Sequence, residues 1–288
     1  MPENTQTPTQ LSETWQQWKE RAKAYFDKIR SLPNDSFEKT LAVAFWVCLA
    51  CAVVVSFAAV ALKPLQQANK AADMKRNILE VAGLWEEGMD IDEAFKRFEI
   101  KVVDLASGEF VEQIDPETYD MRKAAKDPNL SEPLPRERDI AQIKRKPKYA
   151  TVYLLKGEDG QLQAIILPVS GYGLWSTMYG FLALEPDCNT VIGINFYDHG
   201  ETPGLGGEVV NPDWRALWRG KKVYDESGTP VLRLVKGTVD PQQPGAEYMV
   251  DGLAGATLTS NGVSNLIRFW LGEDGYKPFL DKFCGGAR

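Results

Sequence analysis

Residues 251–262 are mostly small side chains, and the hydroxyl of Thr257 lies among them just ahead of a predicted helix. The helix is indicated by an apolar stripe at helical spacing, formed by Val263, Leu266, Ile267, Trp270 and Leu271. We expect Thr259, Ser260 or Asn261 to cap its N-terminus, and Gly272 to follow its C-terminus. The free N–H groups and the positive dipole end of such a terminus favour an anion, so a phosphate beside Thr257 would be stabilised. Taken alone, the string is also compatible with an ordinary capped loop.

A second candidate segment, residues 197–208, contains four glycines and one proline. This composition predicts a tight, exposed backbone path that a flat ligand can approach, although a plain turn has the same composition. The glycines at 204, 206 and 207 lack the spacing of a dinucleotide fingerprint, and no βαβ pattern follows them. We therefore predict no NAD site here.

Residues 251–257, with the pattern Asp-Gly-x-x-Gly-Ala-Thr, resemble the covalent flavin-attachment motif of the FMN-binding domain family of sodium-translocating NADH:quinone oxidoreductases and Rnf complexes. Residues 199–206 resemble the family's His-x-Glu-Thr-Pro-Gly-Leu-Gly signature, and residues 170–176 its opposing segment. With residues 63–79, four matches occur in order, and they favour the sodium-pump branch over the Rnf branch. One departure is Ala254, where the family usually has Ser or Thr; it affects at most an auxiliary hydrogen bond.

The resemblance implies FMN joined through its phosphate to the hydroxyl of Thr257. Leu174 and Trp175 would then pack on one face of the flavin and Leu205 on the other, with Glu201 and Thr202 at its polar edges. Lys236 would pair with the phosphate or the pyrimidine carbonyls, while a solvated surface lysine is the equal alternative. The remaining residues assigned to the cofactor by this resemblance are Gly173, Gly204, Gly206, Ala256, Leu258 and Thr259.

Other site chemistries have little support. His199 is the only histidine, so we predict no metal centre and no Ser-His-Asp relay, and a hydrolase using His199 and Glu201 is the least favoured alternative. Cys48 and Cys51 lie within an apolar run, where they are better read as small apolar side chains than as a redox motif. Whether Cys188 and Cys284 are bonded to each other stays open at this point, because sequence carries no Cα separation.

The chain has 288 residues, of which 44% are hydrophobic and 25% charged, a globular composition with one interruption. Residues 41–62 contain no charge and would form a helix about 33 Å long, enough to cross a bilayer. The polar segment of some forty residues before it argues against a cleaved signal peptide. We predict a segment 1–40, a transmembrane helix 41–62 and a domain 63–288. The net charge of −7 resides in the part after the span, which disfavours nucleic-acid binding.

Basic residues on the two sides of the span are balanced, so charge does not determine its orientation. The family resemblance implies a cytoplasmic N-terminus and a periplasmic flavin domain in the inner membrane. Before the span, one apolar helical face carries Leu11, Trp15, Trp18, Ala22, Tyr25, Phe26 and Ile29, with basic side chains on or beside the other face, ending at Pro33. This pattern is typical of an interfacial helix on anionic lipid, and a helix packed on a partner subunit is the open alternative.

The soluble part predicts an α+β domain around a twisted, largely antiparallel sheet, because strands and helices do not alternate strictly. Residues 65–84 predict a helix continuing from the span, and 149–155 with 161–167 a hairpin through the turn 157–160. The other predicted elements are strands at 100–105, 179–184, 191–197, 222–224 and 232–235, short helices at 91–98 and 214–218, and a surface excursion at 116–147.

In functional terms the resemblance implies a membrane-anchored, phosphothreonyl-FMN electron carrier in a complex that passes electrons from NADH to ubiquinone and transports sodium. Its partners would be other membrane and redox subunits, membrane lipid and an FAD-dependent flavin transferase. The carrier would relay single electrons without meeting NADH or quinone itself. The alternatives are a subunit of an Rnf-type complex and a stand-alone flavin sensor.

Overall fold

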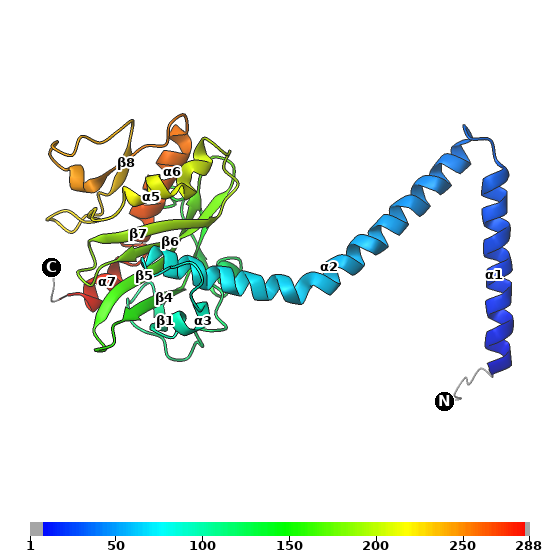
Figure 1. Cartoon of the computed structure of the whole chain (residues 1–288), viewed down its shortest axis with the longest axis horizontal. Coiled ribbons are helices and arrows are strands. Elements are labelled where there is room, and N and C mark those ends of the chain that lie inside the picture. The colour runs from blue at the N-terminus through cyan, green and yellow to red at the C-terminus, as the bar shows by residue number, and fades with distance from the viewer. Residues whose placement is uncertain (1–7, 286–288) are drawn as a thin grey trace. The chain divides into compact units, whose positions relative to one another are not determined.

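The computed structural model describes residues 8–285, in two compact units divided between Asn69 and Lys70 (Figure 1). The first seven residues of the predicted segment 1–40 therefore lie outside the described part. One helix, α2, contains residues of both units. The boundaries 1–40, 41–62 and 63–288 remain predictions, and the two units are treated separately below.

The first unit consists of α1 (Pro8–Ser31) and most of α2 (Phe37–Val81). The turn between them is tied by Lys39, whose ammonium donates to the carbonyl of Leu32 at 2.8 Å and to Oδ1 of Asn34 at 2.9 Å. The most apolar 18-residue window of α2 has a mean hydropathy of 2.6, and none of that window is buried inside the protein. Cys48 and Cys51 are free and exposed on it. As predicted, α2 is long and apolar enough to serve as a single membrane anchor.

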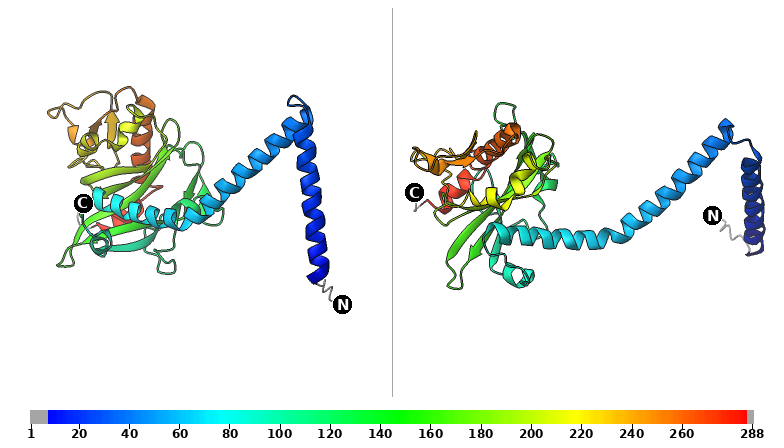
Figure 2. Two further views of the ribbon diagram at one scale, coloured as in Figure 1. Left: turned by 45° about the vertical axis from the view of Figure 1, so that its right-hand side comes forward. Right: turned by 45° about the horizontal axis from the view of Figure 1, so that its top comes forward.

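The second unit is built on a five-stranded antiparallel sheet in the order β1-β4-β5-β6-β7 (Figures 1 and 2). Its strands are β1 (Phe98–Asp104), β4 (Tyr149–Lys156), β5 (Leu162–Tyr172), β6 (Thr177–Leu184) and β7 (Val191–Asp198). The predicted hairpin is confirmed: β4 and β5 pair antiparallel, and the amide of Gly157 donates to the carbonyl of Gln161 at 2.8 Å. The α+β expectation is confirmed with it.

Helices bury both faces of this sheet, which gives the domain three layers. Alternate residues of β5 enter different cores: Ile165 and Leu167 pack toward α6 (Thr257–Trp270) and α7 (Lys277–Phe283), whereas Ile166 packs toward the end of α2. Figure 2 shows α6, in orange, and the cyan end of α2 on different sides of the strands. Because helices cover both faces, the central strands β4, β5 and β6 are apolar over most of their length.

Shorter elements fill the connections and correct two sequence expectations. Residues 222–224 form only isolated bridges and no strand, and the helix expected at 91–98 ends at Phe95, with β1 beginning at Phe98. The excursion 116–147 contains a short helix and a two-stranded antiparallel sheet. The shorter elements are α3 (Ile91–Phe95), α4 (Met121–Ala124), β2 (Ser131–Pro133), β3 (Arg145–Pro147), η1 (Gly206–Val210), α5 (Pro212–Ala216), β8 (Arg233–Val235), η2 (Ala246–Tyr248) and β9 (Met249–Asp251).

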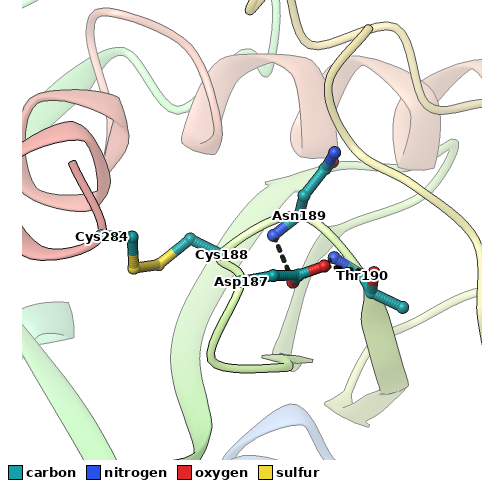
Figure 3. Close-up of a disulfide and its surroundings, with 5 residues drawn as sticks. All are labelled: Asp187, Cys188, Asn189, Thr190 and Cys284. Atoms are coloured by element: carbon teal, nitrogen blue, oxygen red, sulfur yellow. Dashed lines mark hydrogen bonds between the residues drawn. A yellow bond between two sulfur atoms is a disulfide. The ribbon is translucent and has the colours of Figure 1, made fainter. Parts of the chain in front are cut away.

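A disulfide joins Cys188, in the turn between β6 and β7, to Cys284 at the end of α7, with the two Cα atoms 6.2 Å apart (Figure 3). The carboxylate of Asp187 holds this turn by accepting from the amides of Asn189 at 2.9 Å and Thr190 at 2.8 Å. The bond closes a loop of 96 residues that includes α6, so it constrains the unfolded chain strongly.

The last turns of α2 belong to the folded domain. Ile78 and Leu79 are fully buried in the core on the α2 side of the sheet. The buried amide of Asn195, on β7, donates to Oδ1 of Asn77 at 2.6 Å, and Arg215, on α5, forms an ion pair with Glu80 at 3.3 Å. The helix that carries the apolar span thus ends as a structural layer of the domain.

Because the end of α2 is packed in the domain, the same substitution should change the free energy of unfolding by different amounts at two positions of α2. Leu79→Ala removes a fully buried side chain and is expected to lower the free energy of unfolding by about 2–5 kcal/mol. The matched control is Leu65→Ala, because Leu65 is 63% exposed, and a change within about 0.5 kcal/mol is expected there. Urea unfolding of the detergent-solubilised full chain, followed by tryptophan fluorescence, measures both. Equal effects at 65 and 79 would contradict the docking of α2 on the domain.

Candidate functional site

Helix α6 begins at Thr257, one turn earlier than the sequence predicts. The expected caps at Thr259, Ser260 and Asn261 are therefore wrong. The residue at the N-cap position is Ala256, which has no polar side-chain atom, and the structure gives this terminus no side-chain capping hydrogen bond. The Ser260 hydroxyl instead lies inside the first turn, donating to the carbonyl of Ala256 at 3.0 Å and accepting from the amide of Leu253 at 3.0 Å.

This helix start has the properties of an anion site. Thr257 and Leu258 are exposed, whereas Ala256 and Thr259 on either side of them are buried. The first-turn N–H groups have no side-chain acceptor in the described structure, and the dipole of the 14-residue helix makes this end positive. A phosphate on the hydroxyl of Thr257 would lie where these donors can reach it.

The residues just before α6 are held by β8 and β9, which pair in parallel. The carboxylate of Asp251 accepts from the amide of Val239 at 2.8 Å, and its carbonyl accepts from the indole of Trp214 at 3.0 Å. The amide of Gly252 donates to the carbonyl of Gly237 at 3.1 Å. These bonds place the loop of Lys236, whose side chain is exposed, beside the segment that leads to Thr257.

Glu201 is the buried polar centre of the site. The residue is 5% exposed, and its carboxylate accepts hydrogen bonds from the amides of Leu174 and Trp175, both at 3.0 Å from Oε1. Its other oxygen, Oε2, accepts from the hydroxyl of Thr259, in the first turn of α6, at 2.5 Å. One side chain thus joins three segments that are remote in sequence: residues 173–176, residues 199–206 and the start of α6.

Two glycines pack directly on this carboxylate. A Cβ atom on Gly173 would lie 2.6 Å from Oε1 of Glu201, and one on Gly206 would lie 2.8 Å from Oε2 and 2.6 Å from the Thr259 hydroxyl. Such distances are shorter than any real Cβ contact, so a side chain at either position would displace the Glu201 carboxylate from its donors. Both positions therefore require glycine for space. Gly204, by contrast, adopts a φ of +74° and is exposed at the turn, where glycine is required for conformation.

The electrostatic balance at Glu201 favours the charged carboxylate. Burial by itself raises the pKa of this group, but the hydrogen bonds from Thr259, Trp175, Leu174 and Ser176 outweigh burial, and the pKa lies below its ordinary value. The site therefore contains a negatively charged carboxylate that accepts its hydrogen bonds from groups of the protein.

Several large apolar side chains remain exposed on the segments that Glu201 joins. Trp175 is 65% exposed, Leu258 59%, Leu205 43% and Leu174 37%. Leu205 lies against the backbone of Gly255, because a Cβ there would be 3.0 Å from its Cδ2. Exposed side chains of this size next to a helix N-terminus favour a ligand with a flat apolar body and an anionic group.

The loop 199–206 has further internal bonds that sequence reasoning did not reveal. Nδ1 of His199 accepts from the amide of Glu201 at 3.2 Å, and the Ser176 hydroxyl accepts from the amide of Gly200 at 2.6 Å. The exposed Thr202 contributes its carbonyl, which accepts from the amides of Leu205 and Gly207 at 3.1 and 2.9 Å. These bonds form the turn and present Leu205 outward.

Arg122, on α4, also supports the site, and the sequence did not identify it. Its guanidinium lies 3.5 Å from the ring centroid of Tyr179 and forms an ion pair at 2.8 Å with Asp198, at the end of β7. The bond links the excursion 116–147 to the strand that leads into residues 199–206. No local signal predicts it, because Arg122 and Asp198 are 76 residues apart.

Comparison with known proteins places this site in a family. Residues 173–272 match the family model of the FMN-binding domain, a range that contains every residue assigned above to the cofactor. The C subunit of the Na(+)-translocating NADH-quinone reductase of Pseudomonas aeruginosa is 57% identical over 251 residues, covering 86% of this chain and 96% of that protein. Its counterpart in Yersinia pestis is 50% identical, covering 91% of this chain and 97% of that protein.

Solved structures agree with the fold. NqrC of Shewanella oneidensis superposes with a TM-score of 0.71 at 34% identity, covering 76% of this chain and 99% of that one. The C subunit of the same reductase from Parabacteroides distasonis superposes with a TM-score of 0.59 at 28% identity, covering 76% and 96%. The three-layer domain and the order of its segments are therefore shared with these proteins.

The position of Glu201 predicts a pH-dependent loss of stability on substitution. Glu201→Ala leaves three donors without their acceptor and is expected to lower the free energy of unfolding at neutral pH by about 2–4 kcal/mol, with a smaller loss for Glu201→Gln. Because the folded-state pKa is lowered, the wild-type advantage over the Gln variant is present at neutral pH and disappears as the pH falls through that value.

Urea unfolding over a pH series measures this difference. Glu158→Gln is the matched control, since Glu158 is exposed in the turn between β4 and β5 and should show no such dependence. A Glu201→Gln difference that stays constant across the acid range would contradict the charged, protein-bound state described here.

Proposed function

Because this chain belongs to the family of the C subunits of Na(+)-translocating NADH-quinone reductases, with their FMN-binding domain, we propose that it carries FMN covalently on Thr257 and relays single electrons within that complex. The observation that supports this most directly is the uncapped start of α6, which presents an exposed threonine hydroxyl among free N–H groups. Membership of the family implies other subunits of the complex as partners.

The residues of this chain fit such a cofactor. The first-turn N–H groups of α6 would hold the phosphate, and Lys236 would add a positive charge from the neighbouring loop. Leu174, Trp175 and Leu258 would cover the ring and exclude water, together with Leu205 from the opposite segment. Glu201, packed against Gly173 and Gly206, would fix the distance between residues 173–176, residues 199–206 and the start of α6. Thr202 and Gly204 would form the turn at the edge of the ring.

Attachment would form one bond and break one. The hydroxyl oxygen of Thr257 would be joined to the phosphorus of the FMN half of FAD, its proton would be lost, and AMP would leave with the cleaved pyrophosphate oxygen. An FAD-dependent flavin transferase would supply this reaction. A covalent bond would also keep the cofactor from dissociating.

The relay role rests on what FMN supplies when bound, namely transfer of one electron at a time. The chain's own part would be to orient and shield it. The glycines of residues 204–207 lead into η1 and α5, and the five-stranded sheet before them is antiparallel, so among the described residues this glycine-rich turn does not belong to the βαβ unit of a dinucleotide site. Electrons would therefore arrive from and leave to other subunits.

The orientation proposed for the anchor is a cytoplasmic N-terminus and a periplasmic flavin domain in the inner membrane. The disulfide between Cys188 and Cys284 supports it, because such bonds persist in oxidising compartments and are rare in the cytoplasm. The free cysteines Cys48 and Cys51 lie within the apolar span, so they do not indicate on which side of the membrane the domain lies.

Loss of the hydroxyl is expected to abolish attachment. Thr257→Ala, expressed with the transferase, should lack both the fluorescent band on a denaturing gel and the mass increment of FMN, whereas Thr202→Ala, an exposed threonine of the same site, should keep both. A band that survives Thr257→Ala would make the proposed acceptor wrong. In the assembled complex the same variant should lose electron transfer from NADH to quinone, and full transfer without bound FMN would contradict the relay.

Two engineered cysteines test the orientation. In a chain with Cys48 and Cys51 replaced by alanine, a membrane-impermeant maleimide added to spheroplasts should label Glu158→Cys on the domain and not Ala24→Cys on α1. Cys188 and Cys284 should stay unlabelled, since they are bonded to each other and buried. The reverse labelling pattern would place the domain in the cytoplasm.

A further inference from the structure

Helix α1 carries a surface that the proposed flavin function leaves unexplained. From Trp15 onward its large apolar side chains are exposed, with Trp18 at 70%, Trp15 at 67%, Phe26 at 49% and Tyr25 at 44%. At about 3.6 residues per turn they form one stripe, together with Ala22 and the half-buried Ile29. A soluble helix rarely leaves such a stripe open to water, so something apolar covers it.

The charges of α1 are ordered around that stripe. Five basic side chains follow its two borders: Lys19, Lys23 and Arg30 along one, and Arg21 and Lys28 along the other. The acidic residues Glu20 and Asp27 lie together in the middle of the opposite face. Over residues 15–31 the basic side chains outnumber the acidic ones, and all of these charged residues are exposed.

This order matches a lipid surface better than a protein groove. At a bilayer interface, boundary lysines and arginines extend their aliphatic stems along the apolar side and keep their charges among the headgroups, while acidic residues point to water. A groove on a partner protein would also bind the apolar stripe, but it would not require basic side chains along both borders. The excess of positive charge complements anionic headgroups.

Continuity with the anchor supports the same occupant. Only residues 32–36 separate α1 from α2, and the ring centroids of Phe26 and Trp46 lie 5.2 Å apart. The cleft between the two helices is lined mostly by apolar side chains of α1 and of the first turns of α2: Tyr25, Ile29, Phe37, Leu41, Ala42 and Phe45, with Lys28 and Glu38. The stripe thus leads directly onto the surface that enters the membrane.

We propose that α1 is an interfacial helix that binds an anionic lipid leaflet on the N-terminal side of the anchor. The stripe lies at the level of the acyl chains and the two rows of basic residues lie at the headgroups. This inference does not depend on FMN or on Thr257. Its occupant is lipid, and a partner protein over the same stripe is the competing outcome.

Two alanines on opposite faces of α1 provide the test. Ala22 lies in the stripe and Ala24 on the polar face, both exposed, so Ala22→Cys and Ala24→Cys are matched positions for a spin label in the full chain lacking Cys48 and Cys51. The chain is reconstituted without other subunits into vesicles containing phosphatidylglycerol, or into vesicles of phosphatidylcholine alone. The accessibility of each label to oxygen and to a water-soluble nickel complex is then measured.

In phosphatidylglycerol vesicles, the label at 22 is expected to be several-fold more accessible to oxygen, and less accessible to nickel, than the label at 24. In phosphatidylcholine vesicles, or with Lys23→Glu and Lys28→Glu combined, this contrast should shrink several-fold. Equal nickel access at 22 and 24 in the anionic vesicles would overturn the proposal, because the stripe would then face water and not lipid. Equal oxygen access at both would overturn it as well, because α1 would then be immersed in the bilayer.

Discussion

The buried carboxylate of Glu201 is the constraint on which the site depends. A carboxylate taken out of water needs donors from its surroundings, and here they come from the Leu174–Trp175 backbone and from Thr259 in the first turn of α6. Satisfying that one group fixes the separation of the two segments that carry the exposed apolar side chains. It also sets the position of the helix end that presents Thr257. Gly173 and Gly206 are small because the carboxylate leaves no room for a side chain.

The sheet provides the rigid base for this arrangement. Since helices cover both of its faces, the strands that lead into residues 173–176 and 199–206 are held by two cores. The disulfide lies within one of these cores, and the end of α2 is part of the other. The loops of the site can therefore be irregular and exposed, because their ends are anchored in a packed structure.

The two helices of the first unit differ in how charged side chains are distributed around them. The span in α2 is apolar all round, as a bilayer core requires, whereas α1 has an apolar stripe with basic borders, as an interface requires. The domain that follows is acidic, and its two most exposed large apolar side chains, Trp175 and Leu258, lie at the candidate site. Each surface is thus matched in composition to one environment.

Patterns within short stretches determined much of this protein: the uncharged run 41–62, the hairpin at 149–167, the stripe of α6 and the order of the glycine-rich segments. These signals are local, because helix and strand periodicity and turn composition act over a few residues. Only the tertiary structure decided that α6 begins at Thr257 without a cap, that Glu201 is buried beneath the site, that Arg122 reaches Asp198 and that Cys188 is bonded to Cys284. Each of these depends on residues from 58 to 96 positions apart or on a helix terminus set by packing. Local sequence patterns do not specify which distant residues come into contact, because those contacts are made only when the chain packs.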